Sequence, residues 1–151
     1  MYRKVLVPLD GSRESEQVLN SIHGLLDPES EVVLLKVIPP MTGQTIRQIT
    51  LTGSQREEAE RGKVLDYLRG IVQQQEGAPG HWHCEAVVSR SVAEGITNYA
   101  IQEGVDLIAM YTHDRKGLAR LIRGSIAAQV QRNSPIEVRV FRPRELAATT
   151  S

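Results

Sequence analysis

The sequence predicts an α/β fold in which a five-stranded parallel sheet carries helices on both faces. Two observations indicate this class. Short apolar runs alternate with longer segments whose apolar residues recur at helical spacing, in the order βαβαβαβαβ. The run at 31–38, "EVVLLKVI", is nearly continuously apolar, as a strand buried on both faces of its sheet should be. Such alternation implies right-handed crossover connections between parallel strands.

The length and charge of the chain limit the number of domains and the kinds of partner that it could bind. The chain has 151 residues, which fits one domain with a substantial core. Its 18 basic and 18 acidic residues balance, so no net field favours nucleic acid or membrane as a partner. The single cysteine, Cys84, cannot form an intramolecular disulfide, which is typical of a reducing compartment. No apolar run suggests a signal peptide or a membrane span, and we expect a soluble cytoplasmic protein.

The first strand is predicted at 4–9, "KVLVPL", and it leads into Asp10, Gly11 and Ser12. From Ser12 onward the apolar residues fall at helical spacing, and Asp27-Pro28 should end that helix. After the second strand, at 31–38, residues 39–53 are expected to be a long polar connection, a length that is uncommon unless the loop is functional or mobile.

The second half of the chain repeats the alternation. Ser54 and Glu57 are predicted to form a capping box that begins the next helix, and Ser91 with Glu94 a second box. The remaining elements are strands at 81–89, 105–111 and 136–141 and helices following Ser91 and around 126–130. The last strand alternates as a half-exposed strand does. The tail, 144–151, is expected to be flexible.

Ligands of such sheets bind outside the carboxyl ends of the strands, so the residues following each strand are site candidates. Asp10 could bond a ribose or a base, with the next backbone amides facing a polar ligand. Equally, Asp10-Gly11-Ser12 could be a tight turn in which Ser12 caps the helix. Gly124 and Ser125 precede the last helix, and they suit either phosphate binding or an ordinary N-cap.

Basic residues gather in the stretch before that helix. They are His113, Arg115, Lys116, Arg120 and Arg123. They could form a basic rim for an anion, although a solvated helix face is the commoner fate of such a run.

Metal binding and catalysis find little support. His81 and His83 share one face of a predicted strand while Cys84 points to the other, and a zinc site would need further ligands. No G-x-S-x-G elbow and no GxxxxGK[ST] loop is present, and no nucleophile–base pair is identified. We therefore expect no metal, no catalytic residue and no enzyme. Slow ATP hydrolysis and phosphorylation of Asp10 are the catalytic alternatives.

Three stretches in order, "KVLVPLDGS", "LLKVIPP" and "DLIAMYTHDRKGLARLIRGSIAAQVQRNSPIEVRVFRP", resemble the universal stress protein family across residues 2–143. The resemblance implies a Rossmann-like sheet with strand order 3-2-1-4-5 and one domain at 1–143. It also implies a stress-response binding or signalling module that forms homodimers through the last strand, Ile136 to Phe141.

One branch of that family binds ATP through a G-x-x-G-x9-G-[ST] pattern. Here Gly124 and Ser125 match its end, but Tyr111 and Asp114 stand where the first two glycines belong. Glycine permits positive φ and close backbone approach, and tyrosine does not. A carboxylate ~4 Å from a phosphate charge adds repulsion of about 1 kcal/mol in water and about 4 kcal/mol at an effective dielectric near 20. We expect weak or no ATP binding.

The resemblance further implies which residues would hold an adenine nucleotide. Asp10 matches a residue that contacts the nucleotide, and Val37 matches a position whose backbone contacts adenine. The full set of predicted site residues is Pro8, Asp10, Val37, Thr112, His113, Arg123, Gly124 and Ser125. The alternative function is therefore a switch that binds ATP, AMP or cyclic AMP in this cleft.

Overall fold

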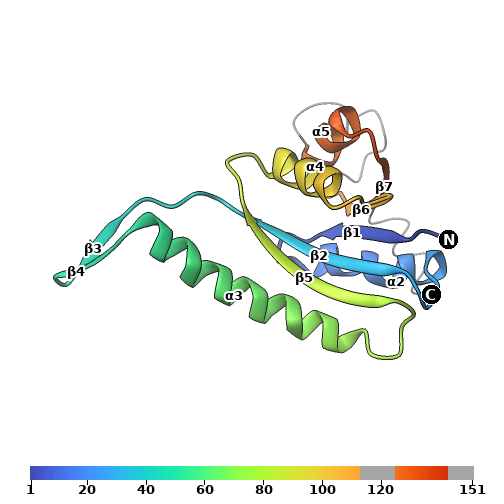
Figure 1. Ribbon diagram of the computed structural model, residues 1–151, viewed down its shortest axis with the longest axis horizontal. Coiled ribbons are helices and arrows are strands. Elements are labelled where there is room, and N and C mark those ends of the chain that lie inside the picture. The colour runs from blue at the N-terminus through green and yellow to red at the C-terminus, as the bar shows by residue number, and fades with distance from the viewer. Residues whose placement is uncertain (113–124, 143–151) are drawn as a thin grey trace.

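A five-stranded parallel sheet forms the centre of the computed structural model, which describes residues 1–112 and 125–142. Its strands are β1 (Lys4–Pro8), β2 (Glu31–Ile38), β5 (His81–Val88), β6 (Leu107–Tyr111) and β7 (Glu137–Phe141). They lie in the order β5-β2-β1-β6-β7, and all neighbours are parallel. Counted along the chain among these five strands, the order is 3-2-1-4-5. The predicted fold is thus confirmed (Figure 1).

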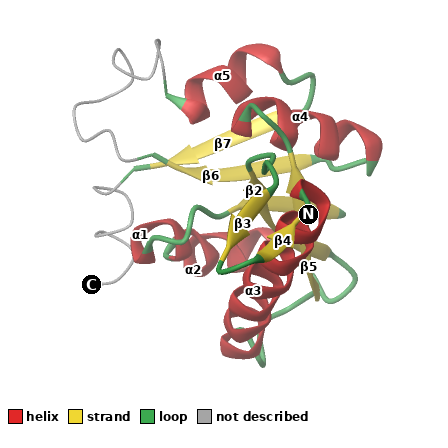
Figure 2. Cartoon of the chain, turned by 90° about the vertical axis from the view of Figure 1, so that its left-hand side faces the viewer, coloured by secondary structure: helices red, strands yellow, loops and turns green. Residues whose placement is uncertain are grey.

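Helices cover both faces of the sheet (Figure 2). One face packs against α1 (Arg13–Glu16), α2 (Val18–Ile22), the short 3-10 helix η1 (His23–Leu25) and α3 (Gly53–Gln74), and the other against α4 (Val92–Gln102) and α5 (Ile126–Asn133). Side chains alternate between these two cores along each strand, so Val5 and Val7 enter the first and Leu6 the second.

The helix predicted to start at Ser12 is broken. Ser12 caps α1 as expected, because its hydroxyl accepts the N–H of Ser15 at 3.2 Å. The Ser15 hydroxyl in turn donates to the Ser12 carbonyl at 2.8 Å and competes with the helical bond. Around Gln17 the backbone turns to tighter i→i−3 bonds, and the segment continues as α2 and η1. It ends before Asp27, as predicted.

Residues 39–53 are not the structureless loop that the sequence predicted. They contain a hairpin of β3 (Gln44–Ile46) and β4 (Ile49–Leu51), which extends beyond the sheet (Figure 1). The turn residues Arg47 and Gln48 both have positive φ, 52° and 68°, as a two-residue type I′ turn requires.

The predicted capping box at Ser54 and Glu57 is wrong by two residues. Helix α3 begins at Gly53 with Thr52 as its N-cap. The Thr52 hydroxyl accepts the N–H of Gln55 at 3.1 Å, and the Gln55 side chain accepts the N–H of Thr52 at 2.8 Å. Threonine followed three residues later by glutamine satisfies the same two donors, so the hairpin can run directly into the helix.

The other predicted boundaries agree with the structure to within a few residues. Ser91 caps α4 by accepting the N–H of Glu94 at 3.2 Å, so this half of the second predicted box is present. At the sheet edge, Val138 and Val140 are half-buried while Glu137 and Arg139 are exposed, which is the alternation expected of β7. The predicted tail, 144–151, lies outside the described residues.

Candidate functional site

A cavity of about 350 Å³ lies where the central strands β1 and β6 end. The chain leaves β1 for α1 on one face of the sheet, whereas α5 follows β6 on the other face. This divergence makes the point between the two strands the topological switch point, where α/β sheets bind ligands. The lining residues are Pro8, Leu9, Asp10, Ser15, Val92, Ile96, Met110, Tyr111, Thr112, Ser125, Ile126 and Ala127.

Asp10 lies at the cavity beside the first helix. Its Oδ1 atom accepts the N–H of Ser12 at 2.8 Å, and Gly11 between them has a φ of 91°. The tight turn with Ser12 as N-cap, one of the two interpretations of this motif, is therefore present. The same turn places the Asp10 carboxyl group in the cavity wall, so the structural role does not remove the residue from the candidate site.

Ser125 lies in the cavity wall with the first turn of α5. Its hydroxyl accepts the N–H of Ala128 at 3.0 Å, so Ser125 is the N-cap of this helix. The amides of a first helical turn point out of the helix end and favour an acceptor or an anion. Asp10 and Ser125 thus bring polar groups to the cavity from the two divergent connections.

Aliphatic side chains supply much of the rest of the wall. Ile96 and Met110 are buried beneath the cavity, and Val92 and Ile126 are 39% and 42% exposed. A site with an apolar wall and a few polar groups suits a flat ligand with a polar substituent. The sequence-based list omitted these four residues. Val92 and Ile126 each follow the N-cap serine of a helix that comes after a strand of the sheet, and that placement is the signal that could have found them.

Tyr111 stands at the first glycine position of the ATP pattern. It belongs to β6, pairs in register with Phe141 and lies in the cavity wall. Among the described non-glycine residues, only Arg47 and Gln48 have positive φ. The backbone at Tyr111 is therefore extended strand, and a bulky side chain occupies a place that glycine would leave open.

The remaining predicted site residues divide into three groups. Pro8 and Thr112 line the cavity with Asp10 and Ser125. Val37 does not line it. Its side chain is buried under α4, where a Cβ added to Gly95 would lie 3.1 Å from one Val37 methyl group. A contact between the Val37 backbone and a ligand stays a prediction. His113, Arg123 and Gly124 lie outside the described residues, as do the other basic residues of that stretch and Asp114.

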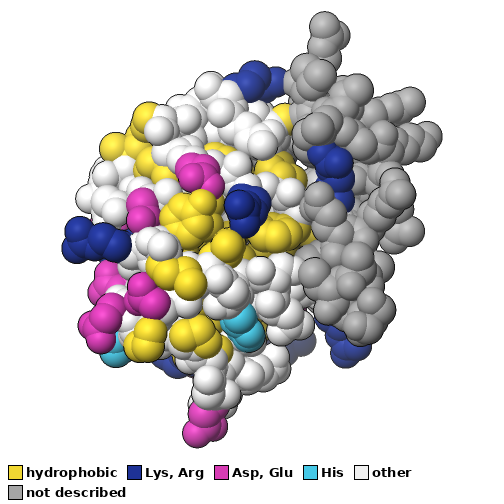
Figure 3. All heavy atoms as spheres, turned by 90° about the vertical axis from the view of Figure 1, so that its right-hand side faces the viewer, with side chains coloured by type: hydrophobic (Ala, Val, Ile, Leu, Met, Phe, Trp, Pro, Cys, Tyr) yellow, Lys and Arg dark blue, Asp and Glu magenta, His cyan; other side chains and the backbone are white. Residues whose placement is uncertain are grey.

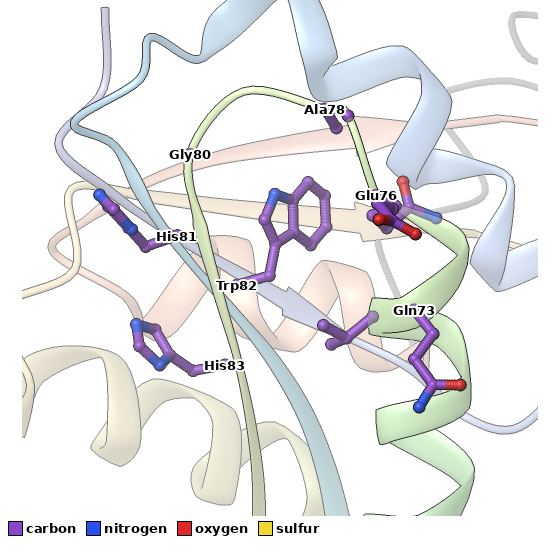
Figure 4. Close-up of a pocket in the computed structure, with 10 residues that line it drawn as sticks. Gln73, Glu76, Ala78, Gly80, His81, Trp82 and His83 are labelled. Carbon is purple, nitrogen blue, oxygen red and sulfur yellow. The ribbon is translucent and has the colours of Figure 1, made fainter.

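A second hollow, of about 540 Å³, lies at the other end of the sheet between the end of α3 and the start of β5 (Figure 4). Trp82 points into it, and its indole N–H donates to the Pro79 carbonyl at 3.1 Å. His81 and His83 point to the opposite side of β5, so they share a face as predicted. Within residues 1–112 and 125–142, no group of three or more His, Cys, Asp or Glu side chains is placed to hold a metal ion.

The amino ends of the strands carry both signs of charge. A hollow of about 760 Å³ there is lined by Lys4, Glu31, Glu103 and Asp106 among others. The Lys4 ammonium group lies 3.9 Å from both glutamates, and Asp106 accepts the backbone N–H of Lys4 at 2.8 Å. Figure 3 shows acidic and basic side chains interspersed on this face. None of the described helices is long and apolar enough to cross a membrane.

Comparison with known proteins identifies relatives. Residues 1–142 match the model of the universal stress protein family. No curated protein matches the chain. Among solved structures, the hypothetical protein MJ0577, whose biochemical function was assigned from its structure, is 26% identical with a TM-score of 0.70, over 94% of this chain and 96% of that one.

Two further structures share the fold at lower identity. A universal stress protein crystallised in complex with cAMP is 16% identical with a TM-score of 0.66, over 93% of this chain and 97% of that one. The universal stress protein UspA from Lactobacillus plantarum is 22% identical with a TM-score of 0.65, over 93% and 98%.

Proposed function

The chain belongs to the universal stress protein family, and from this premise we propose that it is a non-catalytic stress-response module whose cavity binds ATP weakly or not at all. Tyr111 carries the proposal. This residue lines the cavity with extended backbone where the family's ATP pattern has a glycine, and its side chain packs partly against the core that faces α2 and α3. In the sequence, Asp114 replaces the next glycine and adds a negative charge near the place of the phosphates.

The experiment compares ATP binding by the nucleotide-free protein and by its Asp114→Gly variant, with calorimetric titration as the measurement. The wild type should give no saturable heat at micromolar ATP. The glycine variant should bind, because the substitution removes a charge and restores backbone freedom. An Asp66→Asn variant, which removes the charge of an exposed aspartate on α3, should bind no better than wild type. ATP binding by the wild type at micromolar affinity or tighter would contradict the proposal.

A second candidate function is a switch that binds an adenine ligand of lower charge, such as AMP or cyclic AMP. The observation that favours it is the cavity itself, where Asp10 and Ser125 lie beside an apolar wall suited to an adenine ring. A solved universal stress protein was crystallised in complex with cAMP, which supports the same ligand class here.

A thermal-shift panel of adenine nucleotides tests this second candidate function. AMP or cyclic AMP should raise the unfolding temperature of wild type but not of Asp10→Ala, and no shift with any adenine nucleotide would exclude it.

The proposed module is a cytoplasmic homodimer that pairs through the last strand. The support lies in β7, an edge strand whose only sheet neighbour among the described residues is β6. Exposed backbone groups on an edge strand favour pairing with another strand.

A further inference from the structure

The β3–β4 hairpin exposes apolar side chains more densely than the rest of the described surface. Ile46, Ile49 and Leu51 are 57%, 66% and 43% exposed, and every residue from Thr42 to Thr52 is exposed. Of the other exposed large apolar residues in the described ranges, Val92 and Ile126 belong to the cavity already described, and Met1 and Ile101 are far apart in the sequence. Scattered apolar residues are ordinary on a protein surface, whereas a cluster marks an interaction site.

The three aliphatic side chains lie on one face of the hairpin. Ile46 is paired with Ile49, and Gln44 with Leu51, so these four alternate residues share a face. The opposite face carries Thr45 and Thr50, whose hydroxyl oxygens are 2.9 Å apart. The hairpin is therefore amphipathic, although nothing in residues 1–112 and 125–142 covers its apolar side.

The root of the hairpin is held firmly to α3. The Arg56 guanidinium group donates to the Thr42 carbonyl at 2.6 Å, and the Thr52–Gln55 capping box fixes the other strand. Gly53 passes so close to Met41 that an added Cβ would lie 2.2 Å from the Met41 carbonyl oxygen. The hairpin is thus presented in one orientation at the end of a 22-residue helix (Figure 1).

Both strands of the hairpin lack the features that usually block edge pairing. Edge strands are commonly protected by charged residues, by proline or by a covering element. The segments QTI and ITL contain no charge and no proline, and within the described part of the chain the two strands pair only with each other. A two-stranded hairpin alone is marginally stable in water, so a further strand would stabilise it.

We propose that this hairpin binds the same hairpin of a second copy, with the two β4 strands pairing antiparallel about Thr50. In that register Ile49 lies opposite Leu51 of the second copy and Thr50 lies opposite itself. The pairing keeps all aliphatic side chains on one face of a four-stranded sheet, because an antiparallel partner centred on Thr50 preserves the alternation. A two-fold contact of this kind is self-complementary.

Charge favours the antiparallel arrangement. Each turn, with its Arg47, would lie at the root of the other hairpin, where α3 carries Glu57 and Glu58 beside Arg56. In this arrangement the two Arg47 side chains lie at opposite ends of the contact, whereas a parallel pairing would bring these like charges together.

The contact is small compared with the ~800 Å² per partner that stable complexes bury, so it should be weak and reversible on its own. The hairpin follows β2, whereas β7 is the edge strand beyond β6. A hairpin contact is therefore compatible with pairing through β7, and in that case it would join dimers into larger assemblies.

Disulfide trapping tests the register. In a Cys84→Ser background, Thr50→Cys should form an intermolecular disulfide under mild oxidation, because the paired Cα atoms would lie within the ~7 Å limit for a disulfide. Thr45→Cys is the matched control, since it lies on the same face but about 14 Å from its symmetry mate, three strand spacings away. The Thr50→Cys variant should cross-link at least tenfold faster than the Thr45→Cys variant. Equal rates for the two variants would overturn the proposal.

A second experiment is independent of oxidation. The Ile49→Lys, Leu51→Lys double variant should sediment as a smaller species than wild type at the same high-micromolar concentration, with unchanged circular dichroism. Sedimentation identical to wild type would overturn the proposal. A lipid result would overturn it as well. If wild type but not the variant co-sediments with anionic vesicles, and no self-association is detected, the apolar face binds a lipid surface instead.

Discussion

A single glycine determines how the chain begins β5, an edge strand of the sheet. Gly80 precedes β5 with a φ of 99°, and a Cβ there would lie 2.9 Å from the Ser30 carbonyl oxygen. That carbonyl accepts the N–H of His81 at 2.7 Å, so the β5 register depends on this approach.

We expect Gly80→Ala to lower the free energy of unfolding by about 1–3 kcal/mol, since alanine is strained at this φ. Gly70→Ala is the control. Gly70 lies inside α3 with no atom within 4 Å of an added Cβ, and alanine should raise stability there by about 0.5–1 kcal/mol. Urea denaturation measures both changes. Equal effects of the two substitutions would show that the close approach at Gly80 is unimportant.

Tyrosine ionisation should set the stability limit at high pH. Burial raises the pKa of Tyr99 to about 12, helped by the negative charges of Glu85 and Glu103. The neutral phenol is favoured in the folded state, so its contribution is complete below pH ~10, the usual tyrosine pKa, and declines as the pH rises toward 12. Tyr99→Phe should lessen the loss of unfolding free energy as the pH rises from about 9 to about 12.

Tyr67 provides the comparison for this prediction. Burial and the Glu16 carboxylate raise its pKa too, but its hydroxyl also donates to Glu16 at 2.7 Å. Tyr67→Phe should therefore lower the free energy of unfolding at neutral pH, because it removes this hydrogen bond. Tyr99→Phe should leave the free energy of unfolding at neutral pH unchanged and make its decrease at alkaline pH smaller. An alkaline profile that Tyr99→Phe leaves unchanged would argue against a half-buried phenol that stays neutral in the folded state.

The sequence predicted the roles of single residues best where the role depends on neighbouring residues in the chain, as it does for helix N-caps. Ser12, Ser91 and Ser125 could be predicted as helix caps because short polar residues leave a readable signal before a helix. The cavity wall could be predicted only in part. Val92 and Met110 line it because of how α4 and β6 meet, and such tertiary contacts leave no local pattern.

Helix α3 shows how an element boundary can be tested. Thr52→Ala should lower the unfolding free energy by about 1 kcal/mol, because it removes the hydroxyl that accepts the Gln55 N–H. Ser54→Ala, at a position the sequence wrongly suggested as the cap, should change it by less than about 0.5 kcal/mol. Thermal or urea unfolding distinguishes the two, and a larger effect at Ser54 would restore the sequence-based boundary.

The hairpin is the element that sequence reasoning missed, for a physical reason. Two-residue hairpin turns are recognised by Asn-Gly or Asp-Gly, which adopt positive φ readily. Here Arg47 and Gln48 take that conformation, so the usual signal is absent. The alternation in QTI and ITL is present but covers only three residues in each strand.

At the scale of the whole molecule, the fold class could be predicted because the alternation of strands and helices extends along the entire chain. The near-continuously apolar β2 is buried on both faces of the sheet, as its composition indicated. The strand order came from the resemblance in residues 2–143, since periodicity alone does not order strands in a sheet. On the phosphate-facing side of the site, Tyr111 and Ser125 lie in the cavity wall, and the place of Tyr111 there could be predicted only through the resemblance.

Dimerisation through β7 gives a prediction for the whole molecule. At low micromolar concentration the protein should sediment at twice its 16.8 kDa chain mass. The Phe141 carbonyl accepts the Thr112 N–H on the β6 side, so the Val140 amide should face outward along the alternating strand. Val140→Pro should then yield a folded monomer, whereas Val140→Ala should remain dimeric. A dimer that survives the proline substitution would exclude pairing through this edge.

We propose that the cavity retains an adenosine-binding side while its phosphate-binding side is altered. Calorimetric titration of nucleotide-free wild-type protein with ATP, AMP and cyclic AMP tests it most directly. We expect ATP to bind more weakly than AMP and cyclic AMP, or to give no saturable heat, since Tyr111 and Asp114 stand where the ATP pattern has flexible glycines. ATP binding at micromolar affinity or tighter, above that of AMP, would contradict it and show that Tyr111 and Asp114 belong to a working phosphate site.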